Sequence, residues 1–132
     1  MKSTFMKLIA IGAMAASGSL WAGDVFVVAH AGVNVSADDV RDVFVGDKQL
    51  DGSVKLLPMD NSAAQADFLA KVVKVDAEKY KALWVKKGFR DGLSPPPVRG
   101  GDAEVINAVK STPGAIGYVT KTSGDVKVIQ KY

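Results

Sequence analysis

Residues 113–119 read PGAIGYV, and this short run carries the clearest structural signal in the chain. Gly114 follows a proline and can turn the chain sharply, whereas Gly117 allows neighbouring backbone or a helix to approach a strand closely. Ile116 and Val119 are apolar residues that can fill a core. The run therefore predicts a buried strand that is entered through a tight turn.

Strands and helices alternate on the N-terminal side of this run. The apolar pattern predicts further strands at residues 24–30, 54–59 and 125–130, and helices at 36–46, from Asn61 or Ser62 to 73, at 76–87 and at 102–112. We expect Ser36 and Asp102 to cap two of these helices, and Gly46 and Gly88 to end two of them. Such alternation predicts an α/β fold in which helices cover a small mixed sheet.

Two of these segments show their core-facing residues most clearly. Residues 24–30, DVFVVAH, are apolar on both faces, which is typical of a strand buried on both sides, as in a parallel sheet. In the helix at 36–46, Val40, Val43 and Phe44 follow an i, i+3, i+4 spacing and form the predicted inward face.

The first 22 residues have the order of a secretory signal peptide. Lys2 and Lys7 precede an apolar run that is shorter than the roughly 20 residues a membrane span needs, and small residues precede Gly23. Cleavage after Ala22 would leave residues 23–132 as one periplasmic domain with no membrane span. The whole chain has 17 basic and 14 acidic residues, and two lysines leave with the leader, so the mature domain is nearly neutral. This balance argues against nucleic acid as a partner.

The residue types of the chain restrict its chemistry. It has no cysteine and one histidine, His30, so a thiolate or multi-histidine metal site and a Ser-His-Asp triad are both hard to build. No nucleophile–base pair and no pair of carboxylates stands at a recognisable spacing. We therefore expect no metal, no cofactor and no enzymatic activity.

The stretch PMDNSAAQADF, residues 58–68, allows two interpretations. Ser62 and Gln65 have the spacing of a capping box, which would satisfy the helix start internally. Alternatively, the free N–H groups and the Ser62 hydroxyl could bind an anion, which the helix dipole favours. Asp60 argues against the second interpretation because its carboxylate would repel another negative charge.

Three longer segments resemble the PstS-like phosphate-binding proteins of ABC transporters, and in particular small single-lobe members of that family. They are SADDVRDVFVGDKQLDGSVKLLPMDNSAAQADFLAKVV, ALWVKKGFRDGLSPPP and AEVINAVKSTPGAIGYV. Three motifs carry the resemblance: Val43 to Gly46, the pair Trp84 and Phe89 before a proline loop, and Pro113 to Val119, of which the last is the most specific. The resemblance covers nearly all of residues 23–132 and implies one lobe of a type 2 periplasmic-binding-protein fold.

The resemblance also implies export and recognition of phosphate or another small oxyanion at a helix start, here Asn61, Ser62 and Ala63. This sequence departs from the family pattern because no arginine precedes Ser62 and Ala63-Ala64 replaces Gly-Thr. Arg90 and Arg99, which flank the proline loop at 89–101, are the candidates to supply the missing charge. A single lobe offers a wetter site, so we expect weak binding.

Two other functions stay open at this stage. The chain could be an interaction module of the cell envelope that keeps the fold without binding a ligand and acts beside an envelope complex or as a dimer. It could also be an enzyme, which is the least favoured of the three. An ABC transporter permease or another envelope protein is the expected partner.

Overall fold

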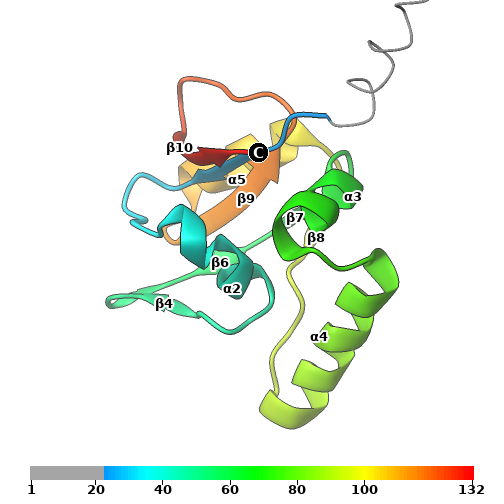
Figure 1. Ribbon diagram of the computed structural model, residues 1–132. Coiled ribbons are helices and arrows are strands. Elements are labelled where there is room, and N and C mark those ends of the chain that lie inside the picture. The colour runs from blue at the N-terminus through cyan, green and yellow to red at the C-terminus, as the bar shows by residue number, and fades with distance from the viewer. Residues whose placement is uncertain (1–22) are drawn as a thin grey trace, which may run out of the picture.

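The structure of the chain is a computed structural model that describes residues 23–132, and the predicted signal peptide, residues 1–22, lies outside the described residues. A four-stranded mixed sheet lies at its centre (Figure 1). The strands follow the spatial order β10 (Lys127–Lys131), β3 (Phe26–Ala29), β9 (Ala115–Val119) and β6 (Leu57–Pro58). β3 is antiparallel to both of its neighbours, whereas β6 is parallel to β9. The predicted small mixed sheet is therefore confirmed.

The strand predicted over 24–30 is present as β3, but its pairing differs from the parallel arrangement that its composition suggested. Val27 lies opposite Tyr118 and Val28 opposite Gly117 in an antiparallel register. Val27 and Val28 are both fully buried although they point to opposite faces of the sheet. Burial on both faces results here from helices on both sides of the sheet, and not from parallel neighbours.

Helices cover the two faces of the sheet unequally. Their bounds are η1, a 3-10 turn (Ala37–Asp39), α2 (Val40–Phe44), α3 (Gln65–Phe68), η2, a π-helical segment (Leu69–Val73), α4 (Ala77–Asp91) and α5 (Asp102–Ser111). α5 packs on one face through Val105 and Val109, whereas α2, α3 and η2 pack on the other. α4 extends away from the sheet, and the chain returns beside it to β8 (Val98–Arg99) (Figure 1).

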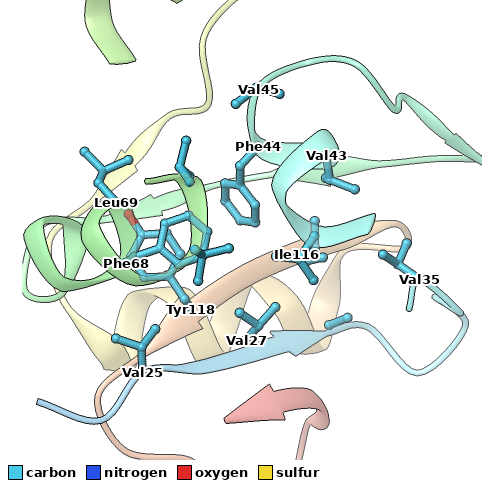
Figure 2. Packing of buried hydrophobic residues seen from close by; sticks show 14 of the residues in the cluster. Val25, Val27, Val35, Val43, Phe44, Val45, Phe68, Leu69, Ile116 and Tyr118 are labelled. Atoms are coloured by element: carbon cyan, nitrogen blue, oxygen red, sulfur yellow. The ribbon is translucent and has the colours of Figure 1, made fainter. Parts of the chain in front are cut away.

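Three aromatic rings form the centre of the larger core cluster. The ring of Phe68 stacks on that of Tyr118 with centroids 3.9 Å apart and planes 3° from parallel. Phe44 meets Phe68 edge-on at 4.6 Å (Figure 2). All three side chains are fully buried, so α2, α3 and β9 are fixed to one another by aromatic packing. The inward positions predicted for Val40, Val43 and Phe44 are confirmed.

The strand predicted over residues 54–59 is wrong as a single element. Residues 54–61 instead pair with three different strands in succession. β5 (Val54–Lys55) pairs with β4 (Leu50–Asp51) in an antiparallel hairpin, β6 pairs with β9, and β7 (Asp60–Asn61) pairs with β8 in parallel. Each of these strands is only two residues long. Through β6 and β7 the segment connects the main sheet to β8, which follows the proline loop.

Several predicted helix ends also differ. The helix expected to start at Asn61 or Ser62 begins at Gln65. Gly88 does not end α4, which continues to Asp91. The residue that caps it is Gly92, which has a positive φ of 70°. Gly88 lies inside the helix, where an added Cβ would be 3.4 Å from the carbonyl oxygen of Leu93, so the returning loop passes close to it.

Two predicted caps are not formed, although Gly46 does adopt the expected left-handed conformation with φ of 82°. Ser36 has extended backbone before η1, but its side chain makes no capping hydrogen bond. Asp102 is the first residue of α5, and its carboxylate accepts hydrogen bonds from Thr120 and Lys121 instead of capping its own helix. Tertiary donors outcompete the local ones here.

Gly117→Val is expected to lower the free energy of unfolding by about 1–3 kcal/mol, because it overpacks a closed contact. A Cβ at this position would lie 2.7 Å from Cγ1 of Val105 and 3.0 Å from Cγ of Met59. Urea unfolding of the variant beside the unchanged chain measures the difference. A midpoint that does not move would show that α5 can shift away from β9 at no cost.

Candidate functional site

The five residues predicted to bind an anion fall into two groups. Asn61 and Arg99 are register partners in the β7–β8 pair, and Ser62 and Ala63 follow directly. Arg90 instead lies in the last turn of α4, at the far end from these strands (Figure 1), and its guanidinium pairs with the neighbouring carboxylate of Asp91 at 3.1 Å. The structure therefore brings Arg99, and not Arg90, to the predicted helix start.

The N–H groups of this helix start are bonded within the protein. Ser62 N donates to the carbonyl oxygen of Arg99 at 2.9 Å, and Ala63 N donates to the side-chain oxygen of Asn61 at 2.9 Å. Ala64 N donates to the Asn61 carbonyl at 3.0 Å. No side chain caps α3, so the predicted Ser62–Gln65 capping box is wrong. The Asn61 side chain takes the N–H of Ala63, and backbone carbonyls take those of Ser62 and Ala64, so these groups are not free for an anion.

Asn61 is fully buried and links three elements. Its Nδ2 donates to Asp102 Oδ1 at 2.8 Å and to the Tyr118 carbonyl at 3.0 Å. The same Asp102 carboxylate accepts from the Thr120 hydroxyl at 2.6 Å and from the Lys121 amide at 3.2 Å. Partial burial acts to raise the pKa of Asp102, but the hydrogen bonds from Thr120, Asn61 and Lys121 outweigh it and hold that pKa below its usual value. This polar network fixes β7, β9 and α5 together.

Asp60, which we expected to repel an anion beside Ser62, points into the core instead. It is 1% exposed, and its two carboxylate oxygens accept from the hydroxyls of Tyr118 at 2.7 Å and Tyr80 at 3.0 Å. Burial raises the pKa of Asp60, and the two tyrosine hydrogen bonds only partly oppose that effect. Desolvation and the nearby carboxylate also raise the pKa of both tyrosines, so they stay protonated donors.

Arg99 opens into a cleft of about 530 Å³ that also contains Lys48 and Lys55. No acidic side chain lines this cationic cleft (Lys48, Lys55, Arg99), and none of its three cations forms an ion pair within residues 23–132. The Nε atom of Arg99 is buried without a hydrogen-bond partner. Gln49, Ser94 and Thr112 add polar groups to the lining. An unpaired guanidinium beside two ammonium groups is suited to an anion.

The sequence pointed to Arg99 but not to the two lysines. Lys48 precedes β4 and Lys55 ends β5, so the β4–β5 hairpin carries both to the same cleft. Lys48 lies between the predicted helix at 36–46 and the predicted strand at 54–59, and Lys55 lies in that strand, so nothing local indicated that either would meet a residue more than forty positions away.

Within residues 23–132, no group of three or more His, Cys, Asp or Glu side chains is arranged to hold a metal ion. In that range no helix combines the length and apolar character needed to cross a membrane. The described residues therefore present a small mixed α/β domain with a cationic cleft.

Comparison with known proteins found a likeness of fold only. No protein-family model matches the chain, and no curated protein matches it. Its structure is similar to PstS from Borrelia burgdorferi, with a TM-score of 0.46 and 14% identity over 74% of this chain and 41% of that one. It is also similar to an ABC-type phosphate transport receptor from Vibrio cholerae, with a TM-score of 0.47 and 12% identity over 82% of this chain and 46% of that one. The chain thus spans less than half the length of either receptor.

Proposed function

We propose that the chain is an exported periplasmic domain that binds phosphate or another small oxyanion weakly, with an ABC transporter permease or another envelope protein as its partner. The observation that carries this proposal is the cationic cleft, where Arg99, Lys48 and Lys55 have neither ion-pair partners nor acidic neighbours in the lining. A cavity lined by one sign of charge concentrates ions of the opposite sign.

The geometry supports weak binding for two reasons. The N–H groups of Ser62 and Ala63 already have acceptors in the protein, and neither residue lines the cationic cleft, so the helix start adds no donor to the site. Lys55 is exposed, and a solvent-exposed ammonium contributes only about 0–1 kcal/mol to an ion pair. We therefore expect Arg99 to contribute most of the binding free energy, because its planar guanidinium can bind an oxyanion through two parallel hydrogen bonds.

Calorimetric titration of the full chain with phosphate is expected to give a dissociation constant no tighter than the high-micromolar range, about 0.1–1 mM. Arg99→Gln should weaken it about tenfold or more, because one charge-assisted hydrogen bond contributes roughly 1.5–3 kcal/mol. Arg90→Gln is the matched control, since Arg90 is paired with Asp91 on α4 and should not contribute.

Two results would contradict this assignment. Submicromolar binding would mean a strong site in place of a weak one. Equal affinities for the unchanged chain and Arg99→Gln, or a loss confined to Arg90→Gln, would place the anion outside the cationic cleft.

Export is a separate part of the proposal and has its own measurement. The charged, apolar and small-residue order of residues 1–22 supports cleavage after Ala22. Mass spectrometry of the protein recovered from the periplasm should give an N-terminus at or near Gly23. An intact Met1 on a membrane-bound species would refute the export proposal without bearing on phosphate binding.

A further inference from the structure

A second cavity, next to the cationic cleft, has a different chemical character. It has a volume of about 700 Å³ and lies between α4 and the returning proline loop. We call it the α4 groove and define it by Tyr80, Trp84, Val85, Phe89, Leu93 and Val98. Its volume falls within the range of about 300–1,000 Å³ that is usual for small-molecule sites.

The α4 side of the groove is a continuous stripe of the helix. The residues that line it are Ala77, Tyr80, Lys81, Trp84, Val85, Gly88 and Phe89, which repeat at intervals of three or four and so lie on one helix face. Much of this apolar surface is open to solvent: Phe89 is 89% exposed, Val98 58% and Val85 52%. Contiguous exposed apolar side chains of this kind are typical of interaction sites and ligand-binding grooves.

The aromatic walls of the groove are held in place by hydrogen bonds at their far ends. Trp84 Nε1 donates to the Phe44 carbonyl at 3.1 Å, and the Tyr80 hydroxyl donates to Asp60 at 3.0 Å. Both side chains are only 6% exposed, so they form a fixed and largely buried base of the groove, which reduces the ordering cost of binding a ligand against it.

Charge decides which ligand suits this groove. Lys81 is its one exposed charged lining residue in the described chain and has no ion-pair partner there. Asp60 also lines it but is buried, with both oxygens bonded to tyrosine hydroxyls. α4 as a whole has the sequence AEKYKALWVKKGFRD, in which basic residues outnumber acidic ones. Pairing this helix with a second copy would bring like charges together, whereas an anionic ligand would be attracted.

We propose that the α4 groove binds a small apolar carboxylate, with an aliphatic or aromatic body against Trp84 and Phe89 and its carboxylate near Lys81. The site adjoins the cationic cleft, since Trp84, Leu93, Pro95 and Pro96 line both, but the cations of that cleft do not line the α4 groove. It assigns the chain a second ligand class, and it does not depend on phosphate binding.

The test uses decanoate, below its micellar concentration, and the fluorescence of Trp84 in the full chain. The sequence contains two tryptophans, so Trp21→Phe leaves Trp84 as the single indole. Decanoate should produce a saturable change in emission, and uncharged decanol should bind about two- to fivefold more weakly. Lys81→Gln should remove this preference, whereas Lys86→Gln, an exposed α4 lysine outside the lining, should preserve it.

Two further variants test the apolar wall. Gly88→Leu places a side chain in the groove from a helical position and should abolish binding of both decanoate and decanol. Phe89→Ala changes an exposed residue, so it should fold normally and weaken both ligands severalfold even if Gly88→Leu does not fold. Arg99→Gln should leave decanoate binding unchanged, which separates this result from that of the phosphate titration.

Three outcomes would overturn the proposal. The first is the absence of saturable binding, and the second is equal affinity for decanoate and decanol that Lys81→Gln does not alter. The third is a dimer in sedimentation velocity that Phe89→Ala dissociates, because the occupant of the groove would then be a second copy of the chain.

Discussion

Gly114→Ala is expected to be the most destabilising of the single substitutions considered, lowering the free energy of unfolding by roughly 2–5 kcal/mol. Two independent costs combine at this position. Gly114 has a φ of 85°, a left-handed conformation that is unfavourable by about 1–2 kcal/mol for an L-residue with a side chain. A Cβ would also lie 2.1 Å from the carbonyl oxygen of Lys55.

The second cost cannot be relieved by a side-chain rotation, because the atom that clashes belongs to the backbone. The Gly114 carbonyl accepts a hydrogen bond from Leu57 N at 2.8 Å, so the same residue holds β6 against the start of β9. Moving the Lys55 backbone away would disturb both the pairing of β5 with β4 and the pairing of β6 with β9. The expected loss is therefore larger than the conformational cost alone.

Two other glycines separate these costs experimentally. Gly52 has a φ of 61° but open space around its Cβ position, so Gly52→Ala should show only the conformational cost of about 1–2 kcal/mol. Gly124 has neither a positive φ nor a close neighbour, and Gly124→Ala should change stability by less than about 0.5 kcal/mol. If urea unfolding shows Gly114→Ala to be at least as stable as Gly52→Ala, the contact between Lys55 and Gly114 adapts to a side chain more easily than the structure indicates.

The strand at Ala115–Val119 could be predicted because its signals are local. Pro113, the two glycines and the apolar residues between them determine a turn and a buried strand without reference to distant partners. The core stripe of α2 was predictable for the same reason, since the spacing of Val40, Val43 and Phe44 is a property of the helix itself.

The predictions that failed concern competition between local and distant partners. Ser62 had the spacing of a cap, but the Asn61 side chain takes the N–H of Ala63, and Arg99 takes that of Ser62. Asp102 had the position of a cap, but Thr120 and Lys121 provide better donors. Such outcomes depend on which segments pack together, and local spacing does not contain that information.

The cationic cleft could be predicted only in part from the sequence, for a related reason. Arg99 flanks a proline-rich loop and is a candidate on that ground, whereas no local pattern marks Lys48 or Lys55. Their convergence follows from the β4–β5 hairpin and from the pairing of β7 with β8, both of which are two-residue contacts that sequence patterns do not specify.

Tyr118→Phe is expected to lower the free energy of unfolding by about 1.5–3 kcal/mol at neutral pH, the usual contribution of a hydrogen bond to a charged group. The ring would keep its stacking on Phe68, so the substitution removes little more than the hydroxyl. That hydroxyl donates to Oδ1 of Asp60 at 2.7 Å, and the carboxylate is too buried for water to replace it readily.

The size of this loss should depend on pH in a definite direction. Burial raises the pKa of Asp60 in the folded state above its unfolded value, so between those two values the folded chain binds more protons than the unfolded chain. Stability contributed by Asp60 is then greatest below the unfolded pKa and is lost as pH rises through the folded pKa. The Tyr118 hydrogen bond lowers the folded pKa, and its removal should shift that loss to a higher pH range.

The difference between the unchanged chain and Tyr118→Phe should therefore shrink as the pH falls and Asp60 becomes protonated in both. Asp102 has the opposite sign, because its lowered pKa contributes stability that is lost in acid, but that contribution is common to both proteins and cancels in the difference. Tyr132→Phe is the control, since the Tyr132 hydroxyl forms no hydrogen bond within residues 23–132. Urea unfolding at a series of pH values measures the difference, and a gap that stays constant or widens in acid would show that the Tyr118 hydroxyl does not act through the charge of Asp60.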